Sequence, residues 1–294
     1  MNKMKKYIIG LGCSWTQGEG GYPEQIWKEH NGRVQVRGRS DYYLRKIEHE
    51  NSWVNVLCRD HFKDYTPMNL GVRGIGNIAA VNQLYFCDKI NWQESTGIII
   101  LMLSGFERLD TFQQYPYTDD HEDDFYSNNE YRHYKYRTAW PIPSEKDGDK
   151  FWDCYSRELW SEQFVCSNQI ISLLNLQTFA KANNYKVVLA NAFNQRREGI
   201  YNYFKSNTGS LVDKFDWSTY VHNNTDYTCF VEKLVHMDGL MPPDHWGGFH
   251  QFYHKRDWPA KYLTNCEGAH PTLEGYKVIA AELARFMKAK EYVK

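Results

Sequence analysis

Three apolar runs constrain the fold of this chain more than any other feature of its sequence. They occupy residues 7–12, 96–104 and 185–193 and are dominated by aliphatic side chains. A membrane-spanning helix needs about 20 apolar residues, so each run is too short to cross a bilayer. Strands that are covered on both faces of a sheet have this continuous apolar character. We therefore expect the three runs to form the buried centre of a parallel β-sheet.

Two further segments have weaker strand patterns. Residues 64–71 include Pro67, which has no N–H to donate and is therefore restricted to an edge strand or to the start of a strand. Residues 230–239 have the least certain pattern of the five. We expect one strand at 64–71, either at an edge of the sheet or with Pro67 near its start, and one more strand at 230–239.

Amphipathic helical patterns separate the predicted strands. They cover residues 51–62, 77–90, 161–183 and 271–288. Asn51 or Ser52 is a candidate N-cap for the first helix, and Pro271 is predicted to begin the last. Alternating strands and helices predict an α/β fold with a parallel sheet. Ligands of such sheets bind at the carboxyl ends of the strands, so the segments that follow each strand are the place to look for a site.

The domain organisation that we predict is a single domain spanning residues 1–294. Two stretches, about 106–158 and 238–265, are too long for simple connections and are expected to be insertions that form lids, binding loops or a partly mobile excursion. No repeat and no shift in composition marks a second domain.

Charge and cysteine usage limit the partners and the compartment. The formal net charge is -1, which predicts no general attraction to nucleic acid or to a membrane surface. The seven cysteines are odd in number and scattered, and the N-terminal apolar stretch is short for a signal peptide. We expect reduced thiols and a cytoplasmic location.

The sequence gives no sign of a metal or a cofactor. His245, His250 and His254 do not have the spacing of a standard zinc site, and the acidic segment 118–124 lacks the pattern of a calcium loop. The glycines of 71–76 are not accompanied by a dinucleotide-binding fingerprint. We predict no metal and no cofactor.

Short segments after the predicted strands resemble the sequence blocks of the SGNH, or GDSL, hydrolase family. GCSWTQG (12–18) is similar to the first block, with Ser14 at the nucleophile position; NLGVRGIGN (69–77) is similar to the second, and EGAHP (267–271) to the last. The resemblance implies a three-layer α/β/α sandwich with a central, mainly parallel, flavodoxin-like sheet and long loop insertions. It also implies a serine esterase that needs no cofactor.

The chemistry of a serine triad gives each residue a role. Ser14 is the predicted nucleophile, His270 the base that removes its proton, and Glu267 the carboxylate that orients the imidazole. A plainer alternative is that Ser14 only caps the helix that follows the first strand.

Stabilisation of the oxyanion is where the sequence departs from the family. The family has an asparagine in its third block, whereas this chain has Glu107, and an ionised carboxylate cannot donate a hydrogen bond. The backbone N–H groups of Ser14 and Gly74 are the predicted donors. The side chains that we consider as replacements for the asparagine are Ser104, Asn194, Asn77 and Arg108. The predicted substrate-binding residues are Trp15, Asn77, Glu107 and Arg108.

The leading hypothesis is a serine hydrolase that cleaves an acyl ester. The 22 tyrosines and 10 tryptophans fit either a large aromatic core or surfaces that stack on sugar rings, so an O-acetylated carbohydrate is the substrate class that we consider first. Two alternatives stay open. The chain is either a family member without turnover that binds a glycan or a protein, or an acyltransferase that passes the acyl group to a sugar hydroxyl.

Overall fold

A parallel β-sheet forms the centre of the molecule. The computed structural model describes residues 4–29, 42–73, 75–105, 109–114, 134–139, 160–192, 199–222, 227, 229–237, 261–264 and 270–293. Within these residues the sheet has four strands in the order β2-β1-β3-β6, and every neighbouring pair is parallel. The strands are β1 (Lys5–Gly12), β2 (Thr66–Asn69), β3 (Ser95–Leu103) and β6 (Tyr185–Asn191).

The predicted strands at 7–12, 64–71, 96–104 and 185–193 are confirmed. β1 and β3 are the central strands and pair over their length, from Lys5 opposite Ser95 to Gly12 opposite Met102. β2 lies at an edge of the sheet, which agrees with the position expected for Pro67.

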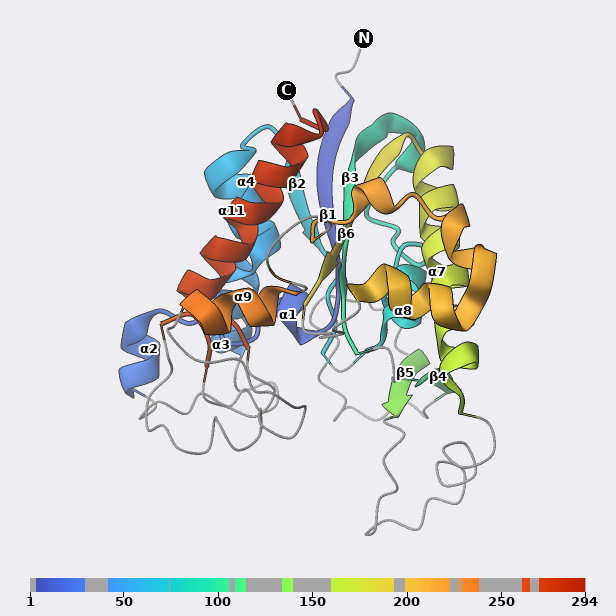
Figure 1. The fold of residues 1–294 in the computed structure, drawn as a ribbon. Helices are drawn as coiled ribbons and strands as arrows, with labels where there is room; N and C mark the ends of the chain where they lie inside the picture. The colour runs from blue at the N-terminus through green and yellow to red at the C-terminus, as the bar shows by residue number, and fades with distance from the viewer. Residues whose placement is uncertain are drawn as a thin grey trace.

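Helices cover both faces of the sheet (Figure 1). On one face lie α4 (Trp53–His61), α9 (Phe230–Met237) and α11 (Leu273–Ala289), and on the other α5 (Asn77–Asn82), α7 (Glu162–Ala182) and α8 (Gly199–Thr208). Alternate residues of the central strands point to the two sides. Ile8, Ile98 and Ile100 join the first core cluster, and Ile9, Ile99 and Leu101 join the second. The apolar runs are continuous because both faces are buried, and the predicted α/β fold is confirmed.

The prediction of a strand at 230–239 is wrong, because these residues form helix α9. Phe230, Val231 and Leu234 are at most 1% exposed and lie in the core cluster next to α11. Leu234 follows Phe230 by four residues and Val231 by three, which places all three on one side of a helix, whereas a strand would have turned Val231 to the opposite face.

Two helix boundaries also differ from the prediction. Pro271 precedes α11 and forms an isolated bridge with Leu263, while Thr272 is the N-cap and accepts a hydrogen bond from the Gly275 N–H. α5 ends at Asn82 rather than continuing to residue 90. At the first helix Ser52, one of the two candidates, is the N-cap.

The remaining described elements are short. They are α1 (Ser14–Gln17), α2 (Glu24–Glu29), α3 (Tyr42–Asn51), the 3₁₀ helices η2 (Trp92–Glu94), η6 (Gly209–Lys214) and η7 (Trp217–Thr219), and the antiparallel pair β4 (Leu109–Gln114) and β5 (Tyr134–Ala139). β4 and β5 belong to the first predicted insertion. The rest of 106–158 and most of 238–265 lie outside the described residues. None of the described helices is both long enough and apolar enough to span a bilayer.

Candidate active site

Ser14 lies at the carboxyl end of the central strand β1, where α1 begins. Gly12, the last residue of β1, has a φ of +146°, and a Cβ there would lie 2.4 Å from Thr16 Oγ1 and 2.7 Å from the Met102 carbonyl oxygen. A glycine is therefore required for the chain to turn directly from the strand into α1. The turn leaves the Ser14 side chain only partly buried, while its neighbours Cys13 and Trp15 are each 1% exposed.

His270 is held in place by a short pairing of two segments ahead of α11. Its backbone N–H donates to Thr264 Oγ1 at 3.1 Å, and the Thr264 N–H donates to the His270 carbonyl at 2.8 Å. Thr272 donates from its hydroxyl to the Lys261 carbonyl at 2.6 Å. These bonds fix the backbone on both sides of the His270 side chain, and the residue is 7% exposed.

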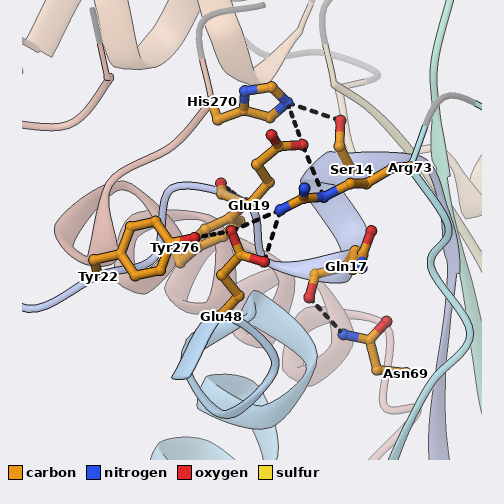
Figure 2. A network of polar contacts seen from close by, with 9 residues as sticks. All are labelled: Ser14, Gln17, Glu19, Tyr22, Glu48, Asn69, Arg73, His270 and Tyr276. Atoms are coloured by element: carbon orange, nitrogen blue, oxygen red, sulfur yellow. Dashed lines mark hydrogen bonds and ion pairs between the residues drawn. The ribbon is translucent and has the colours of Figure 1, made fainter. Parts of the chain in front are cut away.

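The structure brings Ser14 and His270 into hydrogen-bond contact, although 256 residues separate them in the sequence. His270 Nε2 lies 2.8 Å from Ser14 Oγ. Figure 2 shows the imidazole above the serine hydroxyl, with further polar side chains on one side of the pair. A nucleophile and a base at this distance have the geometry that proton transfer requires.

Glu19 is a second neighbour of the imidazole that the sequence analysis missed. Its Oε2 lies 3.3 Å from His270 Nε2, the same nitrogen that contacts Ser14. The Glu19 carbonyl accepts a hydrogen bond from the Tyr276 hydroxyl at 2.8 Å, which ties the turn after α1 to α11. A signal was present in the sequence, since a single carboxylate stands between two glycines directly after the serine block, in QGEGG.

Arg73 connects Glu19 to a buried carboxylate (Figure 2). Its Nε lies 3.3 Å from Glu19 Oε2, and its Nη2 lies 2.8 Å from both oxygens of Glu48. Glu48 belongs to α3, is 1% exposed, and also accepts a hydrogen bond from the Tyr22 hydroxyl. Burial raises the pKa of the Glu48 carboxyl above its usual value, and the Arg73 guanidinium opposes part of that rise. Burial and the nearby Glu48 raise the pKa of Tyr22.

Asn69 fixes the backbone of α1 to the end of β2. Its Nδ2 donates to the Thr16 carbonyl at 2.8 Å, and its Oδ1 accepts from the Gly71 N–H at 2.9 Å. The two strand ends that hold Ser14 and Arg73 are therefore held together by one buried amide.

Asn77 and Ser104 are bonded to each other rather than exposed to a ligand. Asn77 Oδ1 accepts from the Ser104 N–H at 2.7 Å and from its hydroxyl at 3.1 Å, and the two residues are 2% and 1% exposed. The roles predicted for them, substrate binding by Asn77 and oxyanion stabilisation by Ser104, stay predictions. Together they connect the start of α5 to the end of β3.

Trp15 is a core residue. It is 1% exposed and belongs to the same core cluster as Trp53 and Tyr276, so the structure places it in the core beneath the site. Several predicted site residues lie outside the described part of the chain: Gly74, Glu107, Arg108, Asn194 and Glu267. The three histidines at 245, 250 and 254 do so as well, and the described residues contain no cluster of His, Cys, Asp and Glu that could hold a metal ion.

No protein-family model matches the sequence, and no curated protein matches it. The chemistry of the site must therefore be argued from its own residues. These are a serine–histidine pair at the carboxyl edge of a parallel sheet and a chain of charged groups beside it.

Proposed function

We propose that this protein is a serine hydrolase that cleaves an acyl ester through an acyl-enzyme. The observation that most favours this function is the 2.8 Å contact between Ser14 Oγ and His270 Nε2, made between two segments that the sequence alone had already paired. A helix cap would not need a histidine there. In the described residues the hydroxyl makes no capping bond, because Cys13 rather than Ser14 is the N-cap residue of α1.

The first half of the reaction would acylate the serine. His270 Nε2 takes the proton from Ser14 Oγ while Oγ bonds to the ester carbonyl carbon and the π electrons of the carbonyl move to its oxygen. Collapse of this tetrahedral species breaks the bond to the alkoxide, and the alkoxide leaves with the proton from Nε2. In the second half, water gives its proton to His270 and repeats the sequence, releasing the acid and Ser14.

The oxyanion requires donors near Ser14. The Ser14 N–H is the first of α1 and donates to no acceptor among the described residues, so it is available for this role. We propose Gly74 N–H as its partner and Glu267 as the carboxylate at Nδ1, as the sequence resemblance implies. The same resemblance, together with helices on both faces of the sheet, supports a three-layer SGNH-type sandwich as the architecture.

Hydrolysis of p-nitrophenyl acetate by the purified protein tests the proposal. We expect turnover in the wild type and a loss of about 10³-fold or more in kcat for Ser14→Ala and for His270→Ala. Ser210→Ala, at an exposed serine of η6, is the matched control and should leave kcat unchanged. Equal rates in the wild type and in Ser14→Ala would refute the mechanism.

The proposed substrate class is a small-molecule or carbohydrate ester. Acetate release from O-acetylated polysaccharides, compared with release from simple alkyl acetates, would test the carbohydrate preference. An added sugar acceptor that gains the acyl group would instead indicate an acyltransferase.

A further inference from the structure

We propose that Glu19 is a positioning residue that stabilises the imidazolium form of His270, and that Arg73 sets how strongly it does so. Both residues would act on the charge state of His270. The kinetic consequence rests on the proposed hydrolase function, whereas an NMR titration of His270 tests the charge state without it.

The geometry at His270 Nε2 indicates which proton state Glu19 favours. Within the part of the chain that the structure describes, Nε2 contacts Ser14 Oγ at 2.8 Å and Glu19 Oε2 at 3.3 Å. A hydroxyl can donate or accept, whereas an ionised carboxylate can only accept. The contact with Glu19 is therefore favourable only when Nε2 carries a proton, which is its state after it has taken the proton of Ser14.

Arg73, the second partner of Glu19, stabilises the carboxylate when His270 is neutral. When Nε2 has a lone pair and accepts from Ser14, the carboxylate of Glu19 faces that lone pair, and the contact is no longer attractive. Arg73 Nε, 3.3 Å from the same Oε2, then keeps the carboxylate paired. Glu19 thus has a cationic partner in both states, and formation of the imidazolium adds a second one.

The charges around the imidazole are nearly balanced. Among the described residues that make up this network, Glu19 and Glu48 are the acidic groups and Arg73 is the cation, with Glu48 bound by both oxygens to Arg73. The remaining titratable or hydroxyl groups around the network come from four segments: Cys13 and Ser14 at α1, Tyr22 before α2, Tyr276 in α11 and Thr264 beside His270.

The signs of two substitutions follow from this balance. Removing the carboxylate in Glu19→Gln takes away the anion in contact with Nε2 and leaves the positive charge of Arg73 on that side of the imidazole, which disfavours the imidazolium. Removing the cation in Arg73→Gln leaves Glu19 without its competing partner and favours the imidazolium. A purely structural role for these residues would not produce opposite signs.

An NMR titration of the histidine ring carbons tests the inference without reference to any substrate. The His270 signal is assigned as the one that is missing in His270→Gln. We expect the midpoint of its titration to fall by about 1 pH unit in Glu19→Gln and to rise in Arg73→Gln, because an opposite charge in contact shifts a titration by about 1 to 3 units.

Glu94→Gln is the matched control for the loss of one negative charge. Glu94 is exposed in η2, directly before β3, and therefore lies at the opposite edge of the sheet from Ser14. The midpoint of the His270 titration in Glu94→Gln should equal that of the wild type. Glu19→Gln should fold, because the Glu19 side chain is partly exposed and glutamine has nearly the same size and shape. If Arg73→Gln does not fold, the result for Glu19→Gln decides the outcome.

A kinetic measurement separates this inference from the proposed function. If the protein hydrolyses esters, the acid limb of its kcat/KM profile should move to lower pH in Glu19→Gln, by the same amount as the NMR midpoint. A shifted midpoint in a protein without esterase activity would support the role of Glu19 and refute the hydrolase. A His270 midpoint that differs by less than about 0.2 pH unit between Glu19→Gln and the wild type would overturn the inference, whatever the activity.

Discussion

Gly20 determines how closely the turn after α1 can approach His270. Its φ is +90°, and a Cβ at this position would lie 2.7 Å from the Pro271 carbonyl oxygen and 3.1 Å from His270 Cβ. A side chain at residue 20 would push this turn away from His270. Because Glu19 belongs to the same turn, its contact with His270 requires glycine at residue 20. The glycine-rich segment that follows the serine is thus part of the site.

Gly20→Ala should lower both stability and activity. The positive φ alone costs an alanine about 1–2 kcal/mol, and the clash with the backbone of residues 270–271 adds to that cost and displaces the imidazole. Gly209→Ala is the matched control, because Gly209 also has a positive φ of +59° but no atom within 4 Å of the added Cβ.

Urea unfolding and ester hydrolysis measure the two effects. We expect Gly209→Ala to show the backbone cost with unchanged kcat, and Gly20→Ala to show a larger loss of stability together with a loss of activity. Equal stability losses and equal rates in the two variants would contradict the contact between Gly20 and the His270 segment.

Sequence reasoning located Ser14 and His270 because each lies in a short block with recognisable local chemistry. It did not locate Glu19, although the glycines around it were a signal, and it could not locate Arg73, whose role depends on Glu48, a buried partner in a different helix. It could not foresee the mutual hydrogen bonds of Asn77 and Ser104 for a related reason. Polar residues near a predicted site look available in the sequence, and only the fold shows that these two satisfy each other.

At the scale of elements, His222 links the end of η7 to helix α9. Its ring packs edge-on against Phe230 and Tyr220, with centroid distances of 4.6 and 5.5 Å. Burial, with a smaller contribution from Lys233, lowers the pKa of His222 from 6.5 to about 3. The folded protein therefore holds this ring neutral at a pH where the unfolded chain would protonate it.

This burial predicts an acid-sensitive contribution to stability. Between pH 6.5 and 3 the unfolded state binds a proton that the folded state does not, so stability is complete above 6.5 and is lost as the pH falls toward 3. The loss should approach about 5 kcal/mol, since each unit of pKa shift corresponds to about 1.4 kcal/mol. His222→Phe keeps an aromatic ring in the site but has no group that titrates. The free energy of unfolding of this variant, measured with urea, should therefore fall less between pH 6.5 and 3 than that of the wild type. Identical pH dependence in the two proteins would show that His222 is not held neutral by the fold.

The elements themselves could be predicted where burial is symmetrical. β1, β3 and β6 are buried on both faces, so their sequences are continuously apolar, and α7 and α11 are long enough to be recognised as helices. α9 could not be assigned in this way, because its eight residues are too few to separate a helical from a strand period. A proline is common at the first position of a helix, but Pro271 pairs with Leu263 and lies one residue before the N-cap, Thr272.

At the scale of the whole molecule, two core clusters share one sheet. α4, α9 and α11 cover one face, and α5, α7 and α8 cover the other, while the central strands contribute side chains to both (Figure 1). A disturbance of either face is therefore expected to weaken the sheet as a unit.

Two substitutions on opposite faces test this coupling. Leu283 of α11 is fully buried, Leu173 of α7 is 1% exposed, and truncation of either to alanine should cost about 2–5 kcal/mol. Ile171→Ala, at a side chain of α7 that is 48% exposed, is the control and should cost far less. Unfolding followed by circular dichroism and by tryptophan fluorescence should shift together in both leucine variants. Separate transitions for the two faces would contradict a single cooperative unit.

The fold class was predictable because chain length, strand burial and helix spacing all point to the same α/β arrangement. The two long insertions were predictable only as insertions, since their polar and aromatic composition sets no period. The strand pair of 109–114 and 134–139 was not expected from sequence. What the whole fold contributes to function is the approach of residue 14 to residue 270, which the parallel sheet makes possible by ending β1 at the same edge as the segment before α11.

Covalent labelling with a fluorophosphonate, read by mass spectrometry of the intact protein and of its peptides, tests the central claim most directly. Only a serine whose proton is removed by a nearby base reacts rapidly with this reagent. We predict a single phosphonyl adduct on the peptide that contains Ser14, none in Ser14→Ala, and much slower labelling in His270→Ala. An unmodified wild-type protein, or an adduct that persists in Ser14→Ala, would contradict the assignment of Ser14 as an activated nucleophile.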